Sequence, residues 1–114
     1  MQNLEMNPCD TQERLNAYVE MVQGKVNKYF SDMGFTFSDP PEIVAMLGNK
    51  YARVVKIDQL NGSRAVHTFI NILNGDIMKS GGWASPQKNG VRGNIFADDL
   101  GADRVNEHGA IYLR

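Results

Sequence analysis

Positive charge and the only tryptophan of this chain gather in one irregular stretch, "SGGWASPQKNGVRGN", residues 80–94. The stretch contains no acidic residue, and its glycines allow backbone N–H groups to point into a shared concavity, as anion-binding loops require. Three cations lie in it or directly before it: Lys79, Lys88 and Arg92. The pattern predicts that these cations contact phosphate, with Trp83 beside them as a stacking or interface residue.

A second interpretation of Trp83 is structural. An indole is amphipathic and favours half-buried positions, so Trp83 can also be a plug that fixes a long loop to the domain. The stretch matches neither the GxxxxGK[ST] nor the GxGxxG pattern of nucleotide-binding loops. Both interpretations therefore stay open, and they are compatible if the plug positions Lys88 and Arg92.

The other reactive residue types do not assemble into a catalytic or metal-binding pattern. His67 and His108 are the two histidines, and Cys9 is the single cysteine. The acidic residues near the C-terminal end lack the alternate spacing of an EF-hand, and no second nearby histidine suits zinc. We therefore expect a non-enzymatic protein with no catalytic residues, no metal and no cofactor.

Length and composition bound the class of protein. A chain of 114 residues with 42% hydrophobic residues is expected to form one domain, residues 1–114. Its formal net charge of −1 provides no overall attraction to nucleic acid, so such binding needs a local patch. The lone cysteine indicates a reducing compartment, and no apolar run predicts a membrane segment or a signal peptide.

The elements that must position these residues begin with a helix, predicted over residues 10–34 after a flexible segment at 1–9. Apolar residues recur there at the three-and-four spacing of one helical face: Leu15, Tyr18, Val19, Val22, Val26, Tyr29, Phe30 and Met33. Gly34 suits the left-handed position that follows the last turn of a helix.

A β-meander is predicted over residues 42–80. Residues 42–48 are interpreted as a strand, with a short helix as the alternative, and Gly48-Asn49 as a two-residue turn. Asn74-Gly75 indicates a second hairpin turn. We therefore predict an α+β domain, in which the helix packs on about four antiparallel strands and a Gly-rich, loop-rich segment follows at 81–114. Its last residues, 110–114, are read as an edge strand.

The second face of this sheet is a further candidate surface. Strand alternation places Tyr51 and Arg53 on one face, and it places His67 and Phe69 together on the face away from the helix. If this face is open, its aromatic and basic side chains can stack bases. If Trp83 or the C-terminal segment covers it, the face is instead a second core.

The run from residue 49 to 96 resembles a group of small uncharacterised proteins of tailed bacteriophages, particularly marine ones. The shared features are the "VH-x-F" strand, the "GD" turn, the Lys–small–Trp segment and the basic loop ending in "RGNIF". The resemblance carries no established activity and no catalytic residues. It implies a small protein of the host cytoplasm, of a kind that often binds nucleic acid or a host protein.

Two functions remain as hypotheses. The first is binding of single-stranded nucleic acid or a nucleotide through the basic Trp83 loop. The alternative is a protein-interaction module that binds or inhibits a host protein, with Trp83 and Arg92 as anchors. The sequence predicts no membrane partner and leaves a homo-oligomer open.

Overall fold

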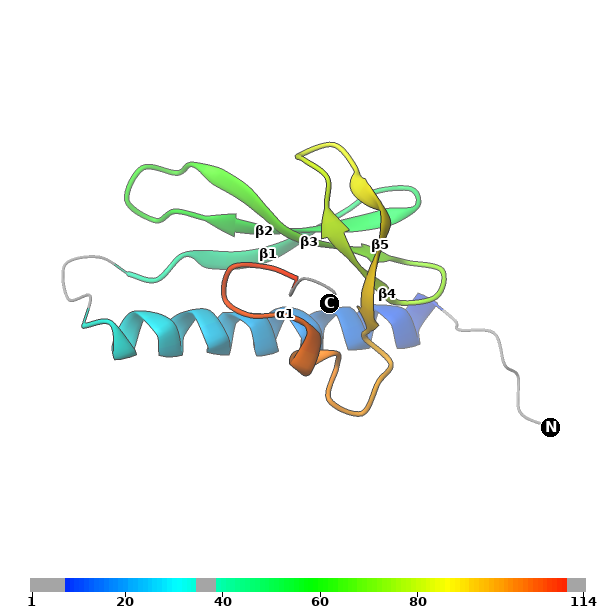
Figure 1. The fold of residues 1–114 in the computed structure, drawn as a ribbon, viewed down its shortest axis with the longest axis horizontal. Coiled ribbons are helices and arrows are strands. Elements are labelled where there is room, and N and C mark those ends of the chain that lie inside the picture. Colours follow the sequence, from blue (N-terminus) through cyan, green and yellow to red (C-terminus); the bar gives the residue numbers. More distant parts are fainter. Residues whose placement is uncertain (1–7, 35–38, 111–114) are drawn as a thin grey trace.

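A computed structural model describes residues 8–34 and 39–110, without the side chains of residues 8–10 and 88–90. One helix precedes a five-stranded antiparallel sheet in the order β1-β2-β3-β4-β5 (Figure 1). The elements are α1 (Pro8–Asp32), β1 (Glu42–Leu47), β2 (Tyr51–Ile57), β3 (Arg64–Asn71), β4 (Asp76–Ser80), β5 (Pro86–Asn94) and the short 3-10 helix η1 (Ala102–Arg104). The predicted α+β class, with one helix on a meander, is confirmed.

Helix α1 buries the apolar stripe that the sequence predicts. Leu15, Tyr18, Val22 and Val26 are each at most 2% exposed. The helix begins two residues before the predicted start and ends at Asp32, so Met33 lies beyond it and is 57% exposed rather than buried. Gly34 has a φ of 74°, which fits its predicted left-handed position.

The first hairpin forms as a strand pair, so the alternative of a helix at residues 42–48 is wrong. Its turn lies one residue later than predicted, because the Gly48 N–H donates to the Tyr51 carbonyl and leaves Asn49-Lys50 as the two turn residues. The predicted hairpin at Asn74-Gly75 also forms, but through a longer loop, in which the Gly75 N–H donates to the Asn71 carbonyl.

The fifth strand corrects the prediction of a loop-rich segment over residues 81–114. Residues 86–94 form β5, which pairs with β4 and shifts register on both sides of Met78. Pro86, Gly90 and Gly93 are unfavourable in strands, and the segment lacks the alternation typical of one. Long-range pairing with β4 therefore decides its conformation.

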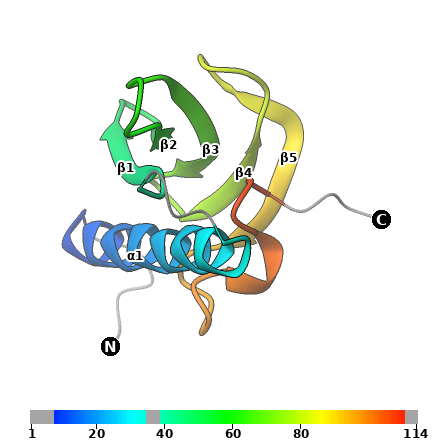
Figure 2. The ribbon, with the colours of Figure 1, turned by 90° about the vertical axis from the view of Figure 1, so that its left-hand side faces the viewer.

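The sheet curls strongly, and its two faces meet different parts of the chain (Figure 2). Helix α1 packs on one face, where Ala52, Val54, Ile70 and Ile77 are fully buried. The tip between β4 and β5, residues 81–85, bends over the opposite face. We call this opposite face the concave face. Its central residues Val55 and Phe69 are also buried, so the fold has apolar contacts on both sides of a single sheet.

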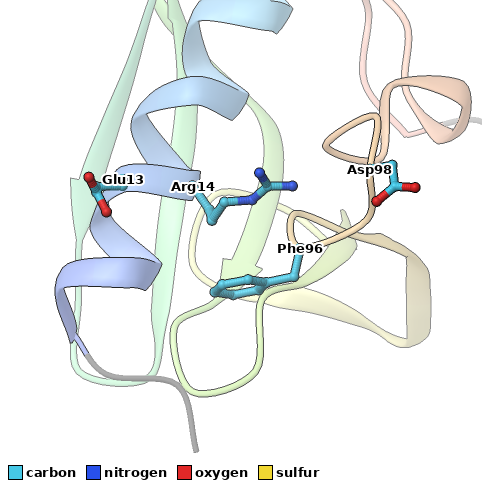
Figure 3. A pocket seen from close by; sticks show the side chains of 4 residues that line it. All are labelled: Glu13, Arg14, Phe96 and Asp98. Atoms are coloured by element: carbon cyan, nitrogen blue, oxygen red, sulfur yellow. The ribbon is translucent and has the colours of Figure 1, made fainter. Parts of the chain in front are cut away.

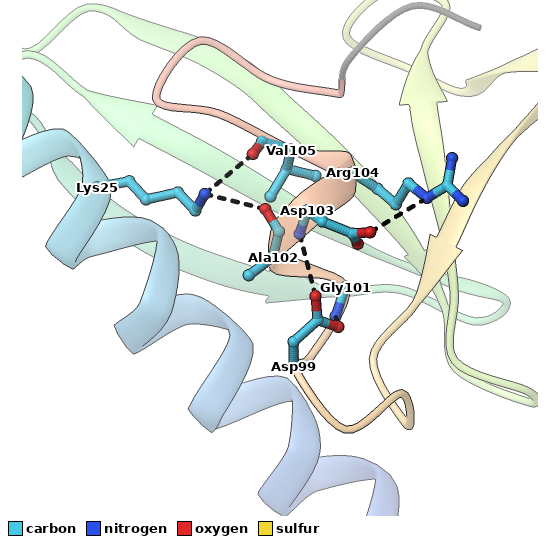
Figure 4. Close-up of polar contacts among 7 residues, drawn as sticks. All are labelled: Lys25, Asp99, Gly101, Ala102, Asp103, Arg104 and Val105. Carbon is cyan, nitrogen blue, oxygen red and sulfur yellow. Dashed lines mark hydrogen bonds and ion pairs between the residues drawn. The ribbon is translucent and has the colours of Figure 1, made fainter.

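The segment after β5 is fastened by hydrogen bonds to α1 rather than by strand pairing (Figure 4). The Lys25 ammonium donates to the carbonyls of Ala102 and Val105 at 2.9 and 3.2 Å. The Asp99 carboxylate accepts from the N–H groups of Gly101 and Asp103. Val105 and Ala110 form an isolated bridge, and the remainder of the edge strand predicted at 110–114 lies outside the described residues. In the described part of the chain, no helix has the length and apolarity needed to cross a membrane.

Replacement of Val22 by aspartate tests the assignment of the buried helix face. Val22 is fully buried, so Val22→Asp puts a carboxylate among apolar side chains and should lower the free energy of unfolding by about 3 kcal/mol or more. Denaturant titration measures this loss. Asn27→Asp, at an exposed position of the same helix, is the matched control and should change stability little. Equal effects of the two variants would contradict the assigned face.

Candidate functional site

Aromatic and basic side chains gather on the concave face where β2 and β3 pair. Arg53 lies directly opposite Phe69, and Tyr51 contacts the Phe69 ring edge-on with centroids 6.1 Å apart. The predicted grouping of Tyr51, Arg53 and Phe69 on one face is therefore confirmed. All three lie in the part of the β2–β3 pair that precedes its register shift, so continuous strand pairing positions them.

Trp83 joins this group through Arg53. The Arg53 guanidinium carbon lies 5.7 Å from the centre of the Phe69 ring and 4.7 Å from that of Trp83. The Arg53 Nε–H also donates to the Trp83 carbonyl at 2.8 Å. Arg53 thus contacts both aromatic rings and fixes the loop at residues 81–85, while the residue Trp83 is 44% exposed. The geometry of Trp83 is therefore compatible with both interpretations: the residue fixes its loop to the sheet, and part of it is exposed to solvent.

Lys50 adds a second cation beside the same rings. Its ammonium lies 5.4 Å from the centre of the Tyr51 ring, on the turn between β1 and β2. Lys50 was not among the residues predicted for this site. Its position in a two-residue turn directly before Tyr51 was the available signal, and the error of one residue in the turn concealed it.

A small cavity of about 180 Å³ opens beside these residues. It is lined by the β1–β2 hairpin, Phe69 and the loop that carries Trp83, and none of its lining residues is acidic: Met46, Leu47, Gly48, Asn49, Lys50, Tyr51, Arg53, Phe69 and Ala84. Two cations and no carboxylate make its mouth favourable for an anion. We refer to Lys50, Tyr51, Arg53, Phe69 and Trp83 as the aromatic–basic cluster.

The concave face is not an open stacking surface. Phe69 is 2% exposed because Arg53 and the Trp83 loop cover it, which decides between the two interpretations of this face. A base therefore has no access to the face of the Phe69 ring. Trp83 and half-buried Tyr51 are the rings of this cluster that solvent reaches.

The cations predicted to contact phosphate lie on β4 and β5. Lys79 and Arg92 are half-buried, and neither lines the cavity beside Trp83. The Arg92 Nη1 donates to the neighbouring Val91 carbonyl at 3.3 Å. Lys88 lies in β5, and its side chain is outside the described part of the structure. Closeness in sequence thus did not place Lys79 and Arg92 at the cavity, whereas Lys50 and Arg53 do line it.

His67 does not lie beside Phe69, so its predicted place on the concave face is wrong. Val54 pairs with Thr68 and Val55 pairs with Val66, which leaves His67 as an extra residue in a β-bulge of β3. The bulge interrupts the alternation and turns His67 toward the helix, where its ring contacts that of Tyr18 with centroids 6.5 Å apart. A stacking role for His67 on the concave face is incompatible with this position.

His67 instead belongs to a buried chain of hydrogen bonds. Its Nε2 lies 2.8 Å from the Asn106 carbonyl, which only accepts, so the neutral ring carries its proton there. Its Nδ1 then accepts from the Thr68 hydroxyl at 3.0 Å, and that oxygen accepts from Tyr18 at 2.7 Å. Burial lowers the pKa of His67 to about 4, and it raises the pKa of Tyr18 far above its ordinary value. Both groups are therefore neutral at pH 7.

A second cavity, of about 430 Å³, lies between α1 and the turn after β5 (Figure 3). Its lining includes two carboxylates, Glu13 and Asp98, which lie on opposite sides of Arg14 in the view and do not form a pair. Arg14 donates to the carbonyls of Ile95 and Ala97 and lies 5.9 Å from the centre of the Phe96 ring. These contacts attach the turn to the helix. Arg14 therefore has a structural role at this cavity, and we do not assign the cavity to a ligand.

The model of a family described as a family of unknown function (DUF7717) matches residues 8–110. No curated protein and no solved structure matches the sequence. The family description names no source, so the resemblance to phage proteins and the host-cytoplasm location stay predictions.

The neutral state of His67 predicts a loss of stability in acid. Its pKa is about 4 in the folded chain and about 6.5 in the unfolded chain, so between these values the unfolded state binds the additional proton. The free energy of unfolding has its full value above pH 6.5, and it falls by about 3 kcal/mol as the pH decreases to 4. A protonated Nδ1 can no longer accept a hydrogen bond, so the buried Thr68 hydroxyl would lose the acceptor of its proton.

Denaturant titration at a series of pH values measures this loss. His67→Gln should be less stable at pH 7 but should lack the drop between pH 6.5 and 4. His108→Gln removes an exposed histidine and is the matched control. Parallel pH curves for wild type and His67→Gln would contradict the assignment.

Proposed function

Because this chain belongs to the family of unknown function that matches it, we propose its function from the geometry: the aromatic–basic cluster binds single-stranded nucleic acid. The observation that supports this most is the Arg53 guanidinium held against the half-exposed Trp83 ring at the mouth of a cavity that no acidic residue lines. A base stacks on the indole, and the adjoining phosphate lies near Lys50 and Arg53.

The size of the cavity favours a strand over an enclosed small molecule. Pockets that enclose a ligand usually measure about 300–1,000 Å³, whereas this one measures about 180 Å³. A cavity of this size suits a phosphate group better than a whole nucleotide. In this proposal the base lies outside the cavity, on the exposed part of Trp83, and the sugar–phosphate backbone continues past the cluster.

Contact through stacking fits the charge of the chain. A net charge of −1 gives no long-range attraction to a polyanion, so affinity must come from the local cations and from ring stacking. Stacking on Trp83 is tolerant of base identity because every base has a π-face. We therefore expect weak, sequence-tolerant binding of short single strands. Lys79, Lys88 and Arg92 remain proposed phosphate contacts for flanking nucleotides, to be tested separately.

Truncation of Trp83 should weaken binding much more than folding. Trp83→Ala removes the stacking ring, so the binding free energy for a labelled oligothymidylate should become less favourable by about 1–3 kcal/mol. Because the indole is half-exposed, the loss of unfolding free energy should be smaller than the loss in binding. Fluorescence anisotropy and denaturant titration measure the two quantities. Leu60→Ala truncates an exposed apolar side chain elsewhere and should change neither. Unchanged affinity of Trp83→Ala would refute stacking on this ring.

The salt dependence of binding tests the cations of the cluster. Lys50→Ala should reduce the slope of log affinity against log salt by about 1, because one phosphate contact is lost. Arg53→Lys keeps the charge but not the planar group that packs on Trp83, so it should weaken binding with the slope retained. Lys28→Ala removes an exposed cation of α1 and is the control. If Lys50→Ala and Lys28→Ala gave the same slope, the phosphate would not be at Lys50.

A further inference from the structure

The outer edge of β1 offers unpaired backbone groups in a fixed pattern. The Gly48 N–H bonds the Tyr51 carbonyl, and bonded and non-bonded pairs alternate along an antiparallel ladder. The N–H and C=O groups of Ile43, Ala45 and Leu47 therefore point away from β2. Those of Ala45 and Leu47 have no hydrogen-bond partner among the described residues.

The first part of this edge is already occupied, and its occupant shows what the edge accepts. The side-chain amide of Gln23 in α1 makes both bonds. Its Oε1 accepts from the Ile43 N–H at 2.8 Å, and its Nε2 donates to the Pro41 carbonyl at 2.9 Å. One amide group thus bonds the strand as the backbone of a neighbouring strand would. The same donors and acceptors continue at Ala45 and Leu47, where no side chain of the described residues replaces a partner strand.

An apolar groove of about 510 Å³ runs along this part of the edge. Leu15 and Val19 of α1 line one side, and Ala45 and Leu47 line the other. Ala45 and Leu47 pair directly with Val54 and Ala52, so their side chains are on the helix face, and Leu47 is 64% exposed. A strand paired with this edge would direct alternate side chains into the groove.

The charges and the shape of the groove select the occupant. Its polar lining consists of Gln12, Asn16 and Glu20, with no lysine or arginine, so it complements a basic side chain. The N-terminal half of α1 reaches past β1 and forms a ledge beneath the edge (Figure 2). A second copy paired through β1 would bring its own α1 helix to that ledge, which the first helix already occupies. A single extended peptide brings no helix, so the edge favours a peptide.

We propose that the β1 edge binds an extended segment of a partner protein by β-strand addition. Two alternating apolar residues of the segment pair with Leu47 and Ala45 and fill the groove, and a lysine or arginine two residues further on shares their face and lies near Glu20. Gln23 closes the edge beyond Ala45 and therefore fixes the register. The opposite sheet edge, β5, shifts register and contains Pro86 and Gly90, so it is a poorer template. This surface uses none of the five residues of the aromatic–basic cluster.

Amide exchange with a synthetic peptide tests this proposal. The probe is acetyl-Lys-Thr-Val-Thr-Val-Thr-Lys-amide at millimolar concentration, with hydrogen exchange followed by NMR on the full chain. Exchange of the Ala45 and Leu47 amides should slow by about tenfold or more. Val44 and Met46, whose groups face β2, are internal references and should hardly change. The same peptide with both valine nitrogens methylated keeps its side chains but loses its donors, so it should give no protection.

A charge exchange supplies the second arm of the test. Glu20 is an exposed helix residue, so Glu20→Lys should fold normally, bind the lysine peptide several-fold more weakly and bind its glutamate counterpart more tightly. No protection of Ala45 and Leu47 by the lysine peptide would overturn the proposal, as would equal protection by the methylated peptide. A dimer by light scattering that Leu47→Pro converts to monomer would also overturn it and assign the edge to a second copy. Loss of oligothymidylate binding in Trp83→Ala bears on neither outcome.

Discussion

The buried hydrogen bond between Tyr18 and Thr68 is the contact through which the helix, the sheet and the C-terminal segment depend on one another. It joins the middle of α1 to β3, and it continues through His67 to the backbone of Asn106. A buried hydroxyl without a partner costs about 1–3 kcal/mol, so each polar group in this chain constrains its neighbour. The order of donors works only while His67 is neutral, which makes the helix–sheet contact the part of the fold most sensitive to acid.

The bulge at His67 makes this arrangement possible. Without it, His67 would point to the concave face, and Thr68 alone would face Tyr18. With it, two consecutive polar side chains lie on the helix side, and the last described segment can close over them. Gly109, with a φ of 148°, passes so close to the His67 carbonyl that a Cβ there would lie 3.0 Å from its oxygen. The close contact between the C-terminal segment and β3 therefore depends on both the bulge at His67 and the glycine at position 109.

How far the sequence predicts this protein follows from the range of the interactions involved. The helix, its buried stripe and the first four strands were predictable because period and turn residues are local signals. Strand β5 was not, since its residues favour a loop and pairing with β4 decides its conformation. The position of His67 was predicted wrongly because a bulge is a property of the pairing between two strands, and the sequence of one strand does not show it. Within the candidate site, alternation placed Tyr51, Arg53 and Phe69 correctly, whereas Lys50 required the turn to be located to the residue.

Formal charge is a poor guide to function here because several cations are used to hold irregular segments. Arg14 bonds the carbonyls of the turn at residues 95–97, and Lys25 bonds those around η1. Arg53 does the same for the Trp83 carbonyl, although no hydrogen bond links its Nη groups to any described residue. Charge-assisted bonds to carbonyls are stronger than neutral ones, and they suit segments that lack a strand partner. The positive charge left for a ligand is therefore set by which cations the fold does not employ, and a count of lysines and arginines cannot supply that distinction.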